Sequence, residues 1–152
     1  MGICMQPYYL THKLRFSCTG CGKCCSTVGD YHVYLTVAEA DRIRNHLGLS
    51  PSWFRRRYLG RLEGGELVLA GNRQGGCVFL TREGKCRIYP VRPLQCSSYP
   101  FWPELVTSRA AWLAEQRRCE GIGRGAIVAV ARIRRAVRQC LEQEPELQSE
   151  TQ

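Results

Sequence analysis

The feature that most limits how this chain can fold is a run of cysteines near its start. The run reads CTGCGKCC and contains Cys18, Cys21, Cys24 and Cys25. Four further cysteines follow at wider intervals: Cys77, Cys86, Cys96 and Cys119. Thiols gathered this tightly either bind a metal ion or an iron–sulfur cluster, or they pair as disulfides. Which of the two applies decides what kind of protein this is.

The rest of the sequence favours metal binding. The first residues show no charged stretch followed by an apolar run, so they predict no secretory signal, and no stretch approaches the ~20 apolar residues of a membrane span. We therefore expect a cytoplasmic protein, or a stromal one if it works in a plastid. In a reducing compartment cysteines are more often metal ligands than disulfides.

The chain is strongly basic, with a formal net charge of +9, and 19 of its 22 basic residues are arginine. Such a surplus is compatible with nucleic-acid binding. A 2+ ion or cluster held by four thiolates carries a charge of about −2, so two such sites would lower the net charge to about +5. Arginine beside a thiolate site would balance that charge, so nucleic acid is an alternative partner but not the favoured one.

Local signals predict an α+β fold, with helices around short β-hairpins and much irregular structure. Helices are expected over residues 37–47, from 51 through Tyr58, from the Ser108 cap through Trp112, and over 124–144. Thr36 and Glu39 form a capping-box pattern, and Gly48 is a helix stop. Strands are expected over residues 31–35, 66–70, 77–80 and 85–89, with a hairpin turn at 81–84.

We expect one small domain, residues 1–144, organised by metal, followed by a flexible tail, residues 145–152. The proline-rich segment 90–103 predicts little regular structure. The hairpin would fold Cys86 back beside Cys77, so that both thiols face one metal. Cys4 and Cys140 stand apart from the other cysteines and are predicted to be ordinary thiols.

The spacing within the dense run resembles that of iron–sulfur proteins. Cys18, Cys21 and Cys24 follow one another with two-residue spacers, as in three-ligand runs whose fourth ligand lies elsewhere in the chain. Adjacent side chains usually diverge, so Cys24 and Cys25 are expected to serve different metals or different irons. Zinc ribbons usually show two separate CxxC knuckles, so iron–sulfur is favoured, with zinc as the alternative or as a second metal.

Three segments together resemble a known family. They are FSCTGCGKCC at 16–25, GGCVFLTREGKCRIYPVRPLQCSSYPFW at 75–102, and CEGIGRG at 119–125. The chain resembles the CxxCxxCC cysteine-cluster family, also called YkgJ-like, whose members are regarded as zinc- or iron-chelating domains. The resemblance implies that the eight motif cysteines match the family's cysteine positions as metal ligands: Cys18, Cys21, Cys24, Cys25, Cys77, Cys86, Cys96 and Cys119.

Two other residues in the second segment have candidate roles at the site. Arg92 could donate hydrogen bonds to sulfur and balance the charge of a cluster, or it could pair with a carboxylate. Tyr89, with Tyr99, Phe101 and Trp102, could form an apolar shell around the metal, or simply pack in the core. We assign Arg92 and Tyr89 as cofactor-contacting residues.

Three functions fit these observations. The first is an iron–sulfur protein, 4Fe–4S favoured, with a second metal and a redox or cluster-dependent role. The second is a zinc-stabilised module that binds a protein or nucleic acid, and the third is an iron- or zinc-handling protein. In the favoured assignment the cluster is bound by Cys18, Cys21 and Cys24 with Cys96 or Cys119, and the second metal by Cys25, Cys77, Cys86 and the remaining thiol. The pattern names no substrate and no redox partner, and it fits an enzyme as well as a binding protein.

Overall fold

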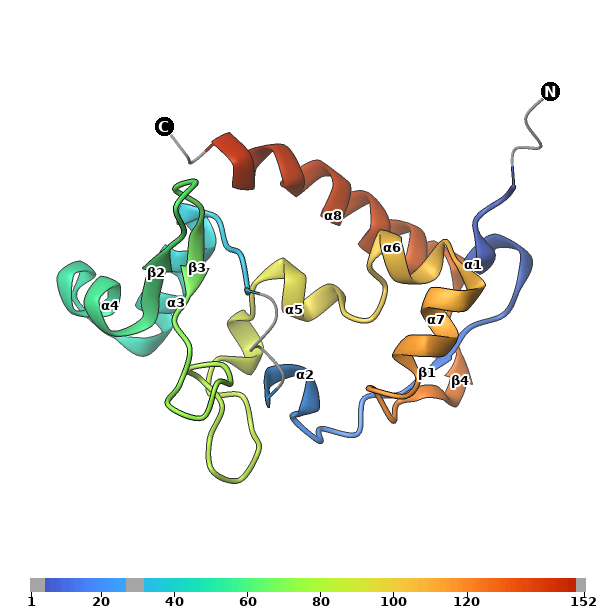
Figure 1. The fold of residues 1–152 in the computed structure, drawn as a ribbon, viewed down its shortest axis with the longest axis horizontal. Coiled ribbons are helices and arrows are strands. Elements are labelled where there is room, and N and C mark those ends of the chain that lie inside the picture. Colours follow the sequence, from blue (N-terminus) through green and yellow to red (C-terminus); the bar gives the residue numbers. More distant parts are fainter. Residues whose placement is uncertain (1–4, 27–31, 150–152) are drawn as a thin grey trace. The chain divides into compact units, whose positions relative to one another are not determined.

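The computed structural model describes residues 5–26 and 32–149, and the chain divides into two compact units (Figure 1). Unit 1 consists of residues 1–19 and 98–141, and unit 2 consists of residues 20–97 and 142–152. The boundary at residues 19 and 20 falls inside the cysteine run. Helices and small antiparallel strand pairs make up both units, which confirms the α+β class.

Unit 2 is built mainly from short elements. They are α2 (Lys23–Ser26), α3 (Val37–Leu47), α4 (Pro51–Tyr58), β2 (Leu59–Arg61), β3 (Leu67–Leu69), the 3-10 helix η1 (Tyr89–Val91) and α5 (Leu94–Ser98), which ends at the unit boundary. β2 and β3 pair antiparallel, with Gly60 opposite Val68. The segment before α3 adds one isolated bridge between Tyr34 and Val68.

Unit 1 combines short helices, one strand pair and most of the longest helix. Its elements are α1 (Tyr8–Thr11), β1 (Arg15–Phe16), α6 (Pro103–Val106), α7 (Arg109–Glu115), β4 (Ile122–Ile127) and α8 (Val130–Ser149), of which residues up to 141 belong to this unit. β1 pairs antiparallel with β4, and the register shifts between Arg15 and Phe16. No helix in the described residues is both long and apolar enough to cross a membrane.

Local capping signals set the ends of α3 and α4. Thr36 Oγ1 accepts from the N–H of Glu39 (3.2 Å), and the Glu39 carboxylate accepts from the N–H of Thr36 (2.9 Å), which is the predicted capping box. Gly48 ends α3 in the left-handed conformation, with φ +65°. Ser50 then caps α4, accepting from the N–H of Trp53. The helix predicted over 37–47 is confirmed at both ends.

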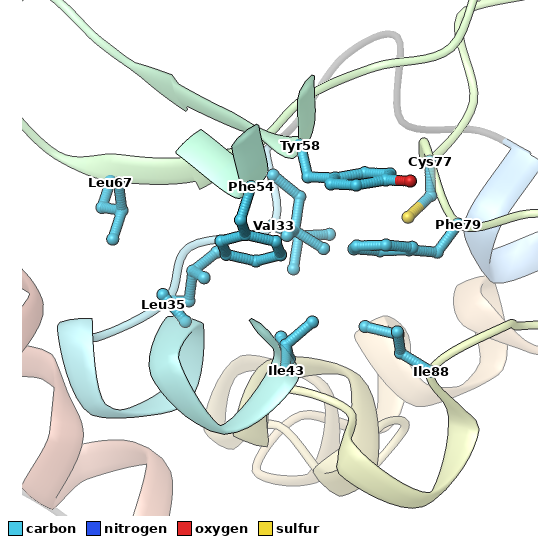
Figure 2. Close-up of a cluster of buried hydrophobic side chains, with 11 residues drawn as sticks. Val33, Leu35, Ile43, Phe54, Tyr58, Leu67, Cys77, Phe79 and Ile88 are labelled. Atoms are coloured by element: carbon cyan, nitrogen blue, oxygen red, sulfur yellow. The ribbon is translucent and has the colours of Figure 1, made fainter. Parts of the chain in front are cut away.

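The core of unit 2 is a cluster of aromatic and aliphatic side chains that also contains a motif cysteine (Figure 2). Tyr58 and Phe79 stack with ring centroids 4.9 Å apart. Cys77 lies beside this pair and is 7% exposed. Leu35 and Ile43, both fully buried, bring α3 and the segment before it into the same cluster. Part of the site is thus built from the hydrophobic core.

The core of unit 1 joins segments far apart in the sequence. Phe101 stacks with Trp112 (centroids 6.3 Å apart) and meets Phe16 edge-on at 5.6 Å. Ile122 and Ile133, each 1% exposed, bring β4 and α8 into this cluster. The core therefore depends on contacts between the first residues of the chain and its last third.

The helix predicted over 124–144 is wrong at its start. Residues 122–127 form β4, and α8 runs from Val130 to Ser149 with Pro145 inside it. Gly123 and Gly125 have φ of +82° and +76°, which suit an irregular strand and not a helix. The assignment of residues 1–144 to one domain and of 145–152 to a flexible tail stays a prediction.

Other elements also differ from expectation. The strands predicted over 77–80 and 85–89 are only isolated bridges, which join Gly71 to Cys77 and Leu80 to Cys86. The proline-rich segment 90–103 is more regular than predicted, because it contains α5 and parts of η1 and α6. Pro90 and Pro103 stand in the first turns of η1 and α6, where a missing N–H costs nothing. Of the strand predicted over 31–35, residue 31 lies outside the described residues.

Candidate metal centre

Unit 2 brings five motif cysteines close enough to affect one another's ionisation. Cys24 and Cys25 stand on α2, Cys77 and Cys86 lie between β3 and η1, and Cys96 is on α5. The N–H of Cys77 donates to the carbonyl of Cys25 (2.8 Å), which ties this loop to α2. After burial, which is the largest cause, the charges of Cys77 and Cys24 raise the pKa of Cys96. Three segments thus bring their thiols near enough to influence one another's ionisation.

Cys24 and Cys25 titrate as a pair. A hydrogen bond between their side chains is the largest cause that lowers the pKa of Cys24, to about 6, and the same bond raises the pKa of Cys25. The proton therefore stays on Cys25, and Cys24 is largely a thiolate at neutral pH, the form that binds metal. The two adjacent side chains, expected to diverge, interact with each other here, and the assignment of Cys24 and Cys25 to different metals or irons stays a prediction.

The other three thiols are protonated at neutral pH. Burial is the largest cause that raises the pKa of Cys77, Cys86 and Cys96, the last to about 12. A coordinating metal displaces the proton of a thiol, so filling this locus would release protons.

The loop that carries Cys21 packs against the turn at 81–85. Gly22 has φ +72°, and a Cβ there would lie 2.5 Å from the carbonyl oxygen of Gly84. Only glycine satisfies both the backbone angle and this close approach. Cys21 itself is exposed. The contact holds the loop of Cys21 against the loop that carries Cys86.

Arg92 acts on the thiols through its charge. Its guanidinium carbon lies 3.7 Å from the centroid of the Tyr89 ring, and its Nε donates to the Tyr89 carbonyl (2.9 Å). Beside the larger effects of hydrogen bonding and burial, this charge lowers the pKa of Cys24, Cys86 and Cys96. The Tyr89 ring is 53% exposed, so it supports Arg92 more than it covers the thiols. The roles of both residues at a bound metal stay predictions.

A buried carboxylate holds the helix that carries Cys96. Glu39 is 5% exposed, and its Oε1 accepts from the N–H of Leu94 (2.7 Å), the first residue of α5. The same oxygen accepts from Gln143 Nε2 (2.9 Å), while Oε2 accepts from the N–H of Thr36. A five-residue helix has little stability of its own. Glu39 therefore fixes the position of Cys96, a role that its capping-box pattern does not reveal.

Gln95 adds a second attachment for α5. Its Oε1 accepts from the N–H of Tyr34 (2.9 Å), and its Nε2 donates to the carbonyl of His32 (2.9 Å). The side chain thus pairs with the backbone before α3 much as a strand would. No pattern in the sequence identifies this role, because the partners lie about 60 residues away.

The remaining two motif cysteines belong to unit 1. The segments around Cys18 and Cys119 lie side by side, with Thr19 Oγ1 donating to Glu120 Oε1 (2.7 Å). Cys18 is exposed, whereas Cys119 is half-buried. The other six motif cysteines belong to unit 2.

Cys119 also interacts with a half-buried tyrosine, Tyr99. Tyr99 donates from its hydroxyl to Glu115 Oε1 (2.6 Å). Burial, then the hydrogen bond to Glu115 and a further one to Cys119, raises the pKa of Tyr99. Phe101, which was expected in an apolar shell with Tyr99, is part of the unit 1 core.

Two cysteines lie outside the motif, Cys4 and Cys140. Cys140 donates from Sγ to Ser98 Oγ (3.3 Å), and burial raises its pKa. Cys4 lies outside the described residues. None of the nine described cysteines forms a disulfide.

The donors are the sulfurs of several thiols, which suit a thiophilic metal such as zinc or iron. The positive charge of Arg92 lies near them and would balance part of the negative charge of bound thiolates. Within residues 5–26 and 32–149, no three His, Cys, Asp or Glu side chains are already arranged as a metal site. The thiols therefore interact electrostatically but are not drawn together as ligands of one ion.

The site and fold define a cysteine-rich metal-binding class, and comparison with known proteins identifies the family. Residues 17–120 match the CxxCxxCC family, described as "Putative zinc- or iron-chelating domain". The match covers more than half of the chain, so the chain belongs to this family.

One relative among curated proteins is the uncharacterized protein MJ0661 of Methanocaldococcus jannaschii, which is 33% identical over 93 residues. That alignment covers 58% of this chain and 46% of the relative, so the matched part spans about half of the relative's length. No solved structure matches the chain.

Proposed function

We propose that the chain holds an iron–sulfur cluster, 4Fe–4S favoured, through cysteine thiolates of unit 2, and that the cluster serves a redox or cluster-dependent role. The observation that carries the proposal is that five thiols from α2, the 77–86 loop and α5 lie near enough to shift one another's pKa. The candidate ligands in this unit are Cys21, Cys24, Cys25, Cys77, Cys86 and Cys96. The dense run with two-residue spacers supports iron–sulfur over a zinc ribbon with two knuckles.

Six thiols exceed the four that one such cluster takes, so the proposal includes a second metal in unit 2. The finer partition, with Cys25, Cys77, Cys86 and the remaining one of Cys96 and Cys119 on the second metal, stays a prediction. The same holds for Cys18 and Cys119 as ligands, which the family resemblance implies.

The chain's own residues would act on the cluster in three ways. Cys24, already a thiolate at neutral pH, offers the first ligand. Arg92 would balance part of the negative charge of the bound thiolates. Glu39 would hold α5 so that Cys96 faces the other thiols. A bound cluster would supply one-electron chemistry, with its potential set by these charges and by solvent exposure.

Zinc as a structural ion is the second candidate, and the burial of Cys77 supports it. This thiol belongs to the hydrophobic core of unit 2 beside Tyr58 and Phe79. An ion held there would add its binding free energy to the folding free energy of a unit built from short elements. Such a centre would make the protein an interaction module whose partner binds elsewhere on its surface.

Anaerobic purification, with a visible spectrum and metal analysis of the same sample, distinguishes an iron–sulfur protein from a zinc protein. A brown protein with broad absorption and about four irons per chain would support the cluster. A colourless protein with stoichiometric zinc, even after iron supplementation during expression, would overturn it in favour of the zinc module.

A further inference from the structure

One helix of unit 2 presents an aromatic ring to solvent beside a run of arginines. Trp53, on α4, is 50% exposed, although the opposite side of this helix is buried in the core of unit 2. Arginines follow at positions 55–57, and all three are exposed. Residues three and four positions apart are neighbours on a helix, so Arg56 and Arg57 lie on the same side of α4 as Trp53. The exposed face of α4 thus combines one ring with two positive charges.

The positive charge of this face is not balanced by carboxylates of the described residues. No acidic residue occurs from position 42 to 62, and no described carboxylate pairs with Arg56 or Arg57. The C-terminal end of a helix dipole is equivalent to about half a negative charge, so it balances only part of the charge of these arginines. The rest is available to an anionic ligand.

The ring of Trp53 is also available to a partner. The guanidinium carbon of Arg56 lies 5.8 Å from the ring centroid, close to the limit of about 6 Å for cation–π attraction. Arg56 is therefore near the ring without packing closely on it. The other exposed cation–π pair of unit 2 differs, because Arg92 lies only 3.7 Å from the centroid of the Tyr89 ring and covers one side of it.

We propose that this face of α4, defined by Trp53, Arg56 and Arg57, binds single-stranded nucleic acid. Proteins hold single strands with aromatic side chains on which bases stack and with cations that follow the phosphates. Trp53 would stack on one base, and the guanidinium groups of Arg56 and Arg57 would bind neighbouring phosphates. The inference does not depend on which metal the cysteines hold.

Other anionic partners fit this face less well. A duplex would use the arginines through its phosphates, but its paired bases would leave the Trp53 ring without a stacking partner. A helix that lies on a membrane needs its apolar side free, and the apolar side of α4 packs in the core. An acidic protein would bind through an apolar centre with few charges, whereas Trp53 has two arginines as its neighbours on the exposed side.

The test is fluorescence anisotropy with the full chain carrying its own metal. The probes are labelled 12-nucleotide oligo(U) and oligo(dT), measured over a range of salt concentrations, with polyglutamate of matched charge as a competitor. Trp53→Ala removes the ring, Trp53→Phe keeps an aromatic ring, and R56Q/R57Q removes two charges. The control R134Q/R135Q removes the same charge from two exposed arginines of α8 in unit 1. Melting temperatures and metal content check that every variant remains folded and loaded.

This control is strict because unit 1 is the more basic unit. Among residues 1–19 and 98–141 there are ten basic and three acidic side chains, a formal charge of +7, whereas unit 2 carries twelve basic and ten acidic ones, or +2. Binding driven by charge alone would therefore weaken at least as much in the α8 variant as in R56Q/R57Q.

We expect Trp53→Ala to bind about 5- to 100-fold more weakly, which corresponds to the loss of one stacked base, with an unchanged slope of log K against log salt. Trp53→Phe should bind nearly as well as the native chain. R56Q/R57Q should reduce the slope by about 1.4, or about 0.7 for each lost phosphate contact. The α8 variant should change affinity and slope much less.

Native affinity in Trp53→Ala would overturn the proposal. So would equal losses in R56Q/R57Q and the α8 variant, or failure of the native chain to bind either oligonucleotide. Polyglutamate that displaces the probe as well as unlabelled oligo(U) does would assign the face to an acidic protein instead.

Discussion

The two units of this molecule differ in the number of motif cysteines, in formal charge and in the elements that organise them. Unit 2 contains six of the eight motif cysteines and a formal charge of only +2, whereas unit 1 contains two of them and +7. Unit 2 sets its thiols on short helices and loops that are fixed by side chains such as Glu39 and Gln95. Unit 1 is organised by a strand pair and the long helix α8.

The comparison shows that one cysteine motif serves two local environments. In unit 2 the thiols interact with one another and with Arg92, so their ionisation is coupled. In unit 1, Cys119 interacts with the half-buried Tyr99 instead. We therefore expect substitutions in unit 2 to affect metal content most, and those in unit 1 to affect it least.

The largest effect is expected from Cys77→Ser. The change removes a candidate ligand and puts a hydroxyl in the hydrophobic core, which by itself costs about 1–3 kcal/mol. Metal content should fall, and the melting temperature should drop by roughly 3–10 °C. Cys140→Ser in unit 1, which also replaces a half-buried thiol, serves as the control and should keep its metal. Unchanged thermal stability of Cys77→Ser would contradict the structural role of this thiol.

Cys25→Ser tests whether the locus holds two metals. The variant should lose the second metal and keep the four irons of the cluster, because Cys25 is assigned to the second metal and Cys24 to the cluster. Metal analysis of the purified variant, with Cys119→Ser beside it, measures this. Loss of all metal would show that the thiols form one inseparable centre, and the partition would be wrong.

The close approach of Gly22 to Gly84 can be tested by substitution. Gly22→Ala meets the carbonyl oxygen of Gly84 at 2.5 Å, whereas Gly48→Ala, at a similar φ, has nothing within 4 Å. Both variants should lose about 1–2 kcal/mol of stability from backbone strain. Only Gly22→Ala should also lose metal, since it pushes apart the loops of Cys21 and Cys86. Equal metal content in the two variants would mean that this contact does not position the ligands.

A smaller effect on metal binding is expected from Glu39→Gln. The amide keeps one acceptor oxygen but faces an N–H donor with its own NH₂, which should cost about 1–3 kcal/mol. Metal should still bind, but dissociation in a chelator challenge should be faster because α5 is held less firmly. Glu83→Gln, an exposed carboxylate, is the control. Identical chelator kinetics in the two variants would remove Glu39 from the support of Cys96.

How much of the fold could be predicted from the sequence depends on how far apart in the sequence the interacting residues lie. The boundaries of α3 follow from Thr36, Glu39 and Gly48, which act within the helix itself, so they were predictable. β4 was not, because it pairs with Arg15 and Phe16 more than 100 residues earlier. The pattern of apolar residues near position 124 is compatible with a helix, and only the pairing and the glycine φ angles decide otherwise.

The candidate site was predictable in composition but not in arrangement. The spacing of the cysteines indicates a thiol-rich metal centre, and the family match supports it. The division of the run between two units depends on packing, as does the hydrogen bond between Cys24 and Cys25. The support of α5 by Glu39 and Gln95 links segments about 60 residues apart, which no local pattern encodes.

The most direct test of the central claim is metal analysis and visible absorption on the anaerobically purified chain, repeated on the variant Cys77→Ser/Cys96→Ser. These two thiols belong to unit 2 and come from different segments. The account predicts a brown native protein with about four irons or more and a variant that has lost its colour. A variant with the metal content and spectrum of the native chain would show that the thiols of unit 2 are not the ligands, and would contradict the account.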